Sequence, residues 1–173
     1  MKGNIILIGF MGVGKGRTAR MLAKKSGNFC VDCDDLIESY TNMKVKNIFK
    51  TQGEPRFREY EQIVARWLQK RVRDTIISTG GGFYKVPNIR KIGTVVFLHS
   101  EFNQILKAIH SHPKAAQKIK KRPLLQDLKK AETLFKQRLP LYRGVADLEI
   151  QVGGRSIDKV TDEIIKRLTD SSC

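Results

Sequence analysis

No stretch of the sequence stays apolar over the roughly 20 residues that a membrane helix needs. Residues 5–11 are apolar, but they follow Met1-Lys2 directly, run into glycines and lack a signal-peptide cleavage pattern. We therefore expect a cytoplasmic protein without a membrane partner. Residues 4–8 are typical of a buried strand.

Cysteine is also scarce: the sequence has three, an odd number without the spacing of a disulfide framework. Cys30 and Cys33 form a Cys-x-x-Cys pair, but no further Cys or His lies nearby in the sequence to complete a metal site. We expect both to pack in a buried strand, as in a protein of the reducing cytoplasm. The histidines show no metal-site spacing and are expected at the surface: His99, His110 and His112.

Acidic residues are few, 17 against 33 Lys and Arg, so the formal net charge is +16. Such a charge favours either a nucleic-acid-binding protein or an enzyme that attracts an anionic small molecule. The segment 114–138 carries nine basic residues against Asp127 and Glu132. Its basic run 114–122 contains no aromatic residue on which bases could stack, which argues against nucleic acid as the partner.

Apolar periodicity alternates between strands and helices along the chain, which predicts a mostly parallel sheet covered on both faces in one domain. The expected strands are residues 4–8, 29–31, 75–78, 93–98 and 148–152. The expected helices are residues 15–25, 36–40, 45–73 with a break at 51–53, 102–109, 126–138 and 157–168. Residues 110–121 interrupt the pattern and are expected to form a functional loop.

A glycine-rich segment between the first strand and the first helix fits the phosphate-loop pattern G-x-x-x-x-G-K, from Gly9 to Lys15. Its backbone N–H groups would surround phosphate oxygens at a helix N-terminus, and the lysine would reach the β- and γ-phosphates. The sequence therefore predicts ATP as co-substrate. The expected nucleotide-binding residues are Gly12, Val13, Gly14, Lys15, Gly16, Arg17 and Thr18.

Gly16 departs from this pattern, which asks for Ser or Thr after the lysine to place a hydroxyl on Mg²⁺. The hydroxyl of Thr18 lies two residues on, about 200° around a helix, and should point elsewhere. Mg²⁺ commonly keeps several waters, and ATP oxygens supply more ligands. We therefore expect weaker or more mobile metal binding rather than an inactive enzyme.

Asp32 and Asp34 stand at the carboxyl end of the second expected strand, where open α/β sheets bind their ligands. Two residues apart in an extended segment, they face the same side. One could orient Mg²⁺-bound water while the other accepts from a substrate hydroxyl. Asp34 could instead, or in addition, cap the helix that follows.

Six blocks resemble the shikimate kinase family in order and spacing over about residues 4–150. The blocks are Gly9-Phe10-Met11-Gly-x-Gly-Lys15, Phe29-x-x-Asp32-x-Asp34-x-x-Ile37-Glu38, Ile48-Phe49-x-x-x-Gly53-Glu54-x-x-Phe57-Arg58-x-x-Glu61, Thr79-Gly80-Gly81-Gly82, Arg122-Pro123-Leu124-Leu125 and Arg138-x-Pro140-Leu141-Tyr142. The resemblance implies a three-layer α/β/α P-loop kinase fold with a five-stranded parallel sheet in a single domain, residues 1–173. It also implies a substrate-binding helical region at about 34–61 and a mobile lid at about 110–124.

The resemblance further implies that a monomer transfers the γ-phosphate of ATP to the 3-hydroxyl of shikimate. It identifies Lys15, Asp34 and Arg122 as catalytic, and Asp32 as the residue that holds Mg²⁺ directly or through water. The implied substrate-binding residues are Asp34, Arg58, Gly80, Gly81, Gly82 and Arg138. Glu54 and Glu61 lie four residues before and three after Arg58, so either could hold its guanidinium. Phe49 and Phe57 are expected to wall the ring or to pack as core residues.

Three alternatives stay open at this point. A related P-loop kinase, for gluconate or a nucleoside monophosphate, is not expected to combine Asp32 and Asp34, Arg58 and the triple glycine. A nucleic-acid-binding protein would explain the charge but not the phosphate loop. A kinase weakened by Gly16 would still bind ATP.

Overall fold

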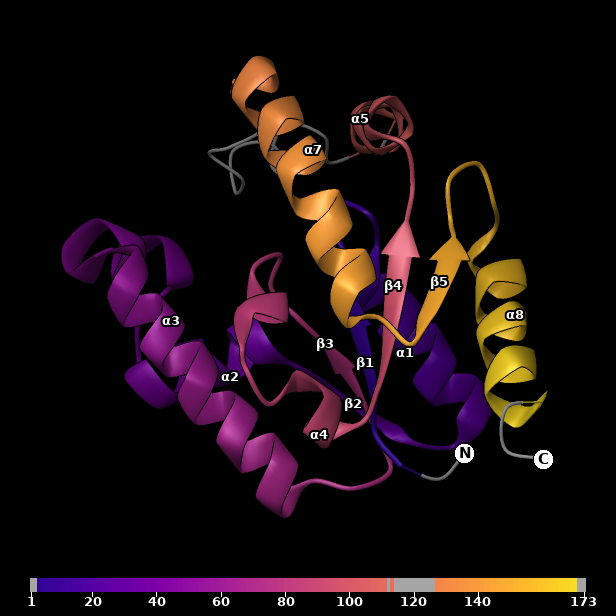
Figure 1. Ribbon diagram of the computed structural model, residues 1–173, viewed down its shortest axis with the longest axis horizontal. Helices are drawn as coiled ribbons and strands as arrows, with labels where there is room; N and C mark the ends of the chain where they lie inside the picture. Colours follow the sequence, from indigo (N-terminus) through magenta and orange to yellow (C-terminus); the bar gives the residue numbers. More distant parts are fainter. Residues whose placement is uncertain (1–2, 112, 114–126, 171–173) are drawn as a thin grey trace.

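The computed structural model describes residues 3–111, 113 and 127–170 (Figure 1). Its sheet has the strand order β2-β3-β1-β4-β5, and every neighbouring pair is parallel. The strands are β1 Ile5–Ile8, β2 Phe29–Asp32, β3 Thr75–Ser78, β4 Thr94–His99 and β5 Leu148–Gln151. The predicted five-stranded parallel sheet is therefore confirmed.

Helices cover both faces of the sheet (Figure 1). They are α1 Lys15–Ser26, α2 Cys33–Thr41, α3 Val45–Arg71, α4 Ile89–Ile92, α5 Phe102–His110, α7 Leu128–Val145 and α8 Ile157–Asp170, with the short 3₁₀ helix η1 Phe83–Lys85. Within the described part of the chain, no helix is long and apolar enough to span a membrane.

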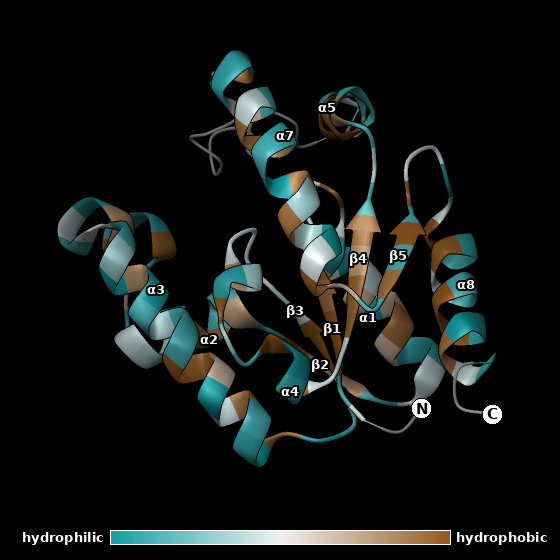
Figure 2. Ribbon diagram, in the orientation of Figure 1, coloured by the Kyte–Doolittle hydropathy of each residue, from teal (hydrophilic) through white to brown (hydrophobic). Residues whose placement is uncertain are grey.

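Strand β1 shows why the molecule has three layers. Successive side chains of a strand point to opposite faces. Accordingly, Ile6 and Ile8 join a core with residues of α2, α3, α5 and α7, whereas Ile5 and Leu7 join a second core with residues of α1 and α8. Figure 2 shows the hydrophobic strands between helices whose outer faces are polar. A strand buried on both faces reads as a continuous apolar run, as residues 5–8 do.

The phosphate loop lies at the carboxyl end of β1, between β3 and β4 in the sheet. Gly14 has φ 105° and directly precedes α1, so the chain turns into the helix through a left-handed residue. This turn places the N-terminus of α1 at the edge of the sheet where ligands bind.

Helix α3 contains the predicted break. Gly53 has φ 80° and ψ 172°, and Pro55 lies in the first turn of the second helical stretch. The kink separates the part of α3 that carries Phe49 from the part that carries Arg58.

Several local expectations were wrong. The cap of α2 is Asp32, not Asp34: the Asp32 side chain accepts a hydrogen bond from the backbone N–H of Asp34. Helix α7 continues beyond Arg138 through Pro140 to Val145. The short elements η1 and α4 were not predicted. The expected lid falls largely on residues 112 and 114–126, which lie outside the described residues.

Candidate active site

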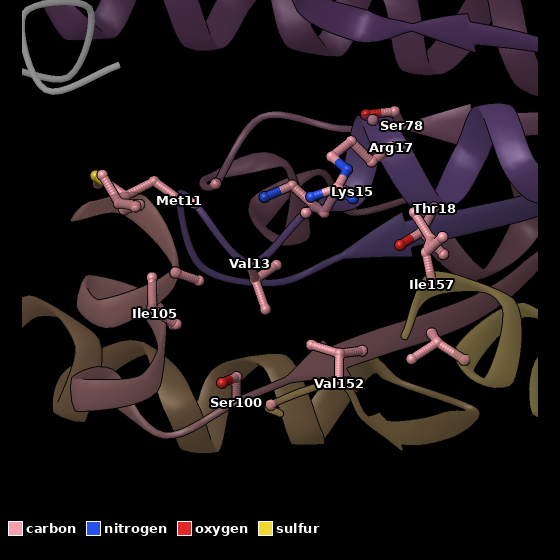
Figure 3. Close-up of a pocket in the computed structure, with 18 of the residues that line it drawn as sticks. Met11, Val13, Lys15, Arg17, Thr18, Ser78, Ser100, Ile105, Val152 and Ile157 are labelled. Carbon is pink, nitrogen blue, oxygen red and sulfur yellow. The ribbon is translucent and has the colours of Figure 1, made fainter. Parts of the chain in front are cut away.

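A cavity of about 640 Å³ opens at the carboxyl ends of the strands (Figure 3). Its wall includes all seven predicted nucleotide-binding residues, 12–18, together with Asp32, Asp34, Gly80 and Gly81. Helix α5 and the segment 152–155 after β5 form the opposite wall. Most of the predicted site residues within the described part of the chain therefore surround one cavity, whereas Arg58, Gly82 and Arg138 are not among its lining residues.

Lys15 begins α1 and is 9% exposed. Its Nζ donates hydrogen bonds to the carbonyl oxygens of Gly9, at 2.7 Å, and Phe10, at 3.1 Å. The ammonium group is thus held against the loop that would surround the phosphates. A bound phosphate anion would compete with these two carbonyls for the same charge.

Helix α5 packs directly on the phosphate loop, a contact that was not predicted. A Cβ atom on Gly12 would lie 2.6 Å from Ile109 Cδ1 and 3.1 Å from Ile105 Cγ2. A side chain at position 12 would require Ile109 to shift, and Gly12 also has φ 87°, a conformation that other residues rarely adopt. The apolar spacing of 102–109 had indicated a helix, but nothing in the sequence indicated its neighbour.

Asp32 joins two strands at the floor of the cavity. Its Oδ1 accepts from the Asp34 N–H at 3.0 Å, and its Oδ2 accepts from Ser78 Oγ at 2.7 Å. The sequence prediction missed Ser78, because its register with Asp32 depends on the pairing of β3 with β2. Both Asp32 oxygens therefore accept hydrogen bonds from protein donors.

Asp34 is an unusual carboxylate. Its Oδ1 is buried and has no hydrogen-bond partner within the described residues. Burial, helped by the charges of Asp32 and Glu61, raises the pKa of Asp34 to about 7. A carboxylate with such a pKa can take up a proton near neutral pH, as a general base must.

Arg58 lies between two carboxylates of its own helix, as the spacing predicted. Its Nε and Nη2 donate to Glu54 Oε1 at 3.0 and 2.6 Å, and its Nη1 donates to Glu61 Oε2 at 2.6 Å. Hydrogen bonds from Arg58 lower the pKa of Glu54, whereas burial raises that of Glu61. Glu61 is 1% exposed, so the paired guanidinium is what makes its charge tolerable.

The triple glycine lets this network approach the backbone. A Cβ on Gly80 would lie 2.7 Å from Asp34 Oδ1, and one on Gly82 would overlap the Arg58 guanidinium. The carbonyl of Gly81 accepts hydrogen bonds from Arg138 Nη1 at 3.1 Å and from Tyr142 Oη at 2.6 Å. The structure therefore brings Asp34, Arg58, Arg138 and the three glycines into one connected cluster.

The two phenylalanines expected to wall the ring or to pack in the core differ in their exposure. Phe57 is buried in the core, whereas Phe49 is 39% exposed. Their rings lie 4.7 Å apart with a tilt of 36°. The Arg58 Cζ atom lies 5.5 Å from the centroid of the Phe57 ring, so the guanidinium packs over the face of this ring.

Some predicted residues are not in this cluster. Arg122 lies outside the described residues. His99 is buried, not at the surface: it stacks on Phe97, and its Nδ1 lies 2.8 Å from Glu149 Oε1. The expectation that Cys30 and Cys33 pack in a buried strand was wrong: Cys33 is buried but begins α2, and Cys30 is only partly buried in β2. The described residues contain no group of three or more His, Cys, Asp or Glu that could hold a metal.

Comparisons of the sequence with known proteins find shikimate kinases. A family model described as "Shikimate kinase" matches residues 11–169. A shikimate kinase from Chromobacterium violaceum is 35% identical over 178 residues, covering 99% of this chain and 92% of that protein.

Comparisons with solved structures find the same fold. The structure described as "Shikimate kinase from Acinetobacter baumannii in complex with shikimate" superposes with a TM-score of 0.85 at 31% identity, covering 98% of this chain and 94% of the other. A gluconokinase from Sinorhizobium meliloti, at 13% identity and a TM-score of 0.55, shares the fold alone.

Proposed function

Since the chain belongs to the shikimate kinase family, we propose that it transfers the γ-phosphate of ATP to the 3-hydroxyl of shikimate, giving shikimate 3-phosphate and ADP. The observation that carries this proposal is the position of Arg58. Its guanidinium is held by Glu54 and Glu61 beside Gly82, in the same cluster as Asp34. Shikimate offers one carboxylate and three hydroxyls, which an arginine and a carboxylate can bind.

On the acceptor side, Arg58 and Arg138 bind the shikimate carboxylate. Arginine presents paired N–H groups that match the two carboxylate oxygens. Gly80, Gly81 and Gly82 let Asp34, Arg138 and Arg58 approach the backbone, and they offer backbone N–H groups to the acceptor. Glu54 and Glu61 do not touch the acceptor; they orient Arg58.

Asp34 accepts the proton of the attacking hydroxyl. Its pKa of about 7 suits this task, because the carboxylate is ionised just above neutral pH and still basic enough to take a proton. The hydroxyl oxygen then attacks the γ-phosphorus in line, the bond to the β-γ bridging oxygen breaks, and ADP leaves. No covalent enzyme intermediate is formed.

On the nucleotide side, residues 12–18 bind ATP, with Lys15 stabilising charge on the transferring group. A magnesium ion fits here, because the Asp32 carboxylate lines the cavity beside the phosphate loop. Asp32 would hold the ion, directly or through water, and the bound ion would neutralise phosphate charge. Arg122, outside the described residues, is proposed to contact the transferred phosphate from the lid.

We also propose that the protein is a cytoplasmic monomer and that residues 1–173 form one kinase domain. The two hydrophobic cores share the strands of one sheet, which supports a single folding unit. The positive charge would then attract the anionic substrates rather than nucleic acid.

An acceptor comparison tests the function. ADP release is measured with ATP and Mg²⁺ in the presence of shikimate, of gluconate or of neither, and the product is identified by phosphorus NMR. We expect ADP release to depend on shikimate and the phosphate to appear on the 3-oxygen. Turnover with gluconate alone would replace this proposal with the gluconate-kinase alternative.

A further inference from the structure

Position 16 lacks the hydroxyl that phosphate loops place after the lysine, yet another hydroxyl lies beside it. A Cβ atom on Gly16 would lie 3.8 Å from Ser78 Oγ and 3.9 Å from Asp32 Oδ2. A side chain at position 16 would therefore point toward Ser78 and Asp32. Ser78 also lines the cavity although it is only 3% exposed.

The sheet fixes the direction of this serine. Ser78 is the last residue of β3, paired with Leu7 of β1 and with Asp32 of β2. Paired residues of neighbouring parallel strands project to the same face, so Ser78 and Asp32 point together toward the start of α1. Figure 3 shows Ser78 on the same side of Val13 as Lys15 and Arg17, away from Ser100 and Val152.

The chemistry of the pair suits a hard cation. Ser78 Oγ donates a hydrogen bond to Asp32 Oδ2 at 2.7 Å. The lone pairs of the Ser78 oxygen therefore remain available to a cation. Mg²⁺ takes oxygen ligands at about 2.0–2.1 Å, so two ligands of one ion lie about 3 to 4 Å apart. A hydroxyl at position 78 can therefore reach a cation that a hydroxyl at position 16 would have bound.

We infer that Ser78 supplies the hydroxyl ligand that Gly16 cannot, and that Ser78 and Asp32 together hold the divalent cation of the bound nucleotide. The inference rests on the proposed use of a magnesium nucleotide, and it identifies a residue of this chain that compensates for its own departure from the motif. It revises the expectation of weak metal binding: the site keeps a hydroxyl oxygen, from the sheet instead of the helix.

Arg20 offers a competing arrangement. Its Nη1 would lie 3.5 Å from a Cβ at position 16, so its guanidinium could itself neutralise phosphate charge there. Under that arrangement, ADP would bind equally well with or without a divalent cation, and the Ser78 hydroxyl would not matter. The two arrangements therefore differ in a measurable way.

The test measures Mn²⁺ binding to the complex of protein and ADP by electron paramagnetic resonance, since Mn²⁺ shares the oxygen preference of Mg²⁺. Four proteins are compared: wild type, Ser78→Ala, Thr75→Ala and the double variant Gly16→Ser/Ser78→Ala. Thr75 is the matched control, because its hydroxyl lies at the other end of β3 and donates to Arg73 O at 2.8 Å.

Ser78→Ala should weaken Mn²⁺ binding about 10-fold or more, the usual effect of losing a ligand or its support. Thr75→Ala should bind as wild type does, and Gly16→Ser should restore the affinity of Ser78→Ala to within about threefold. That rescue separates ligation from support of Asp32, because a serine at position 16 brings back a ligand without replacing the hydrogen bond of Ser78.

Three results would overturn the inference: unchanged Mn²⁺ affinity in Ser78→Ala, a loss that Gly16→Ser does not restore, or wild-type ADP affinity that is independent of the cation. If Ser78→Ala does not fold, Ser78→Cys serves instead; its softer sulfur should shift preference from Mg²⁺ to Cd²⁺, and no shift would also overturn the inference. Shikimate is absent throughout, so failure here is distinct from failure of the proposed function, which would appear as absent shikimate turnover with normal Mn²⁺ binding.

Discussion

The acceptor cluster around Arg58 and the phosphate loop are built by different means. On the acceptor side, side chains already contact one another: Arg58 is held by Glu54 and Glu61, and Arg138 and Tyr142 both donate to the Gly81 carbonyl. Recognition of the acceptor therefore rests on preorganised side chains.

On the nucleotide side, backbone geometry dominates. The loop turns into α1 at Gly14, and Lys15 donates to loop carbonyls that a phosphate would replace. Arg17 and Arg20 are exposed. In the proposed function, the phosphates of ATP and a divalent cation bind on this side. Changes there should therefore act on turnover and metal dependence, whereas changes on the acceptor side should act on shikimate affinity.

The largest effect is expected from Lys15→Ala. Removing the only lysine of the loop should lower kcat on the order of 10³-fold, because charge on the transferring group loses a preorganised donor. The measurement is steady-state ADP release with saturating shikimate. Lys24→Ala, an exposed lysine of the same helix, is the matched control, and near-normal turnover of Lys15→Ala would contradict the assignment of the phosphate loop.

Arg58→Ala tests whether the acceptor cluster acts on shikimate affinity separately from ATP affinity. Loss of the charge-assisted hydrogen bonds should raise the KM for shikimate about 30-fold or more, with the KM for ATP nearly unchanged. Titration of each substrate at saturation of the other gives both constants.

The control for this change is Arg56→Ala on the same helix. Arg56 pairs with exposed Glu59, and surface ion pairs contribute little. Because Arg58→Ala leaves Glu61 buried without its partner, folding is checked by circular dichroism. A large rise in the ATP KM of a folded Arg58→Ala protein would place the acceptor site elsewhere.

The substitution Asp34→Asn tests whether the pKa of Asp34 is raised in the folded protein. Because the folded pKa is raised from 3.8 to about 7, the folded state binds the proton more tightly than the unfolded state does. The resulting stability is complete below pH 3.8 and is lost as pH rises through 7. Asparagine carries no charge at any of these pH values.

We therefore expect Asp34→Asn to raise the melting temperature at pH 8 by about 5 °C more than at pH 5. Asp35→Asn, at an exposed neighbour, should show a smaller difference. Equal shifts at the two pH values would mean that Asp34 titrates at its ordinary pKa. In wild type, kcat/KM for shikimate should fall as pH drops through about 7.

The smallest effect is expected from Glu54→Gln. Glu54 is half-exposed, and Arg58 keeps Glu61 as a partner, so the shikimate KM should rise only about twofold to fivefold. Glu61→Gln, which changes the buried partner, should have the greater effect. The reverse order of the two variants would show that the exposed carboxylate is the one that orients Arg58.

The order of elements could be predicted because it follows from local patterns. Residues 5–8 are continuously apolar, the glycine-rich loop follows them, and Gly53 interrupts an apolar repeat of 3.6 residues. The pairing of Arg58 with Glu54 and Glu61 also followed from helical spacing and is confirmed.

What could not be predicted depends on contacts between distant segments. Ser78 reaches Asp32 only because β3 lies beside β2, and Ile109 meets Gly12 only because α5 returns over the loop. His99 was expected at the surface, but a strand covered on both faces buries it. The roles assigned to Lys15, Asp34, Arg122 and Arg138 stay predictions.

The most direct test of the account is calorimetric titration of shikimate into nucleotide-free protein, with Arg58→Ala and Arg56→Ala in parallel. Because hydrogen bonds within the protein hold Arg58 and Arg138 in place, we expect saturable 1:1 binding to wild type and to Arg56→Ala, and binding weakened about 30-fold or more in Arg58→Ala. Absence of shikimate binding to folded wild-type protein, or equal binding by all three, would contradict it.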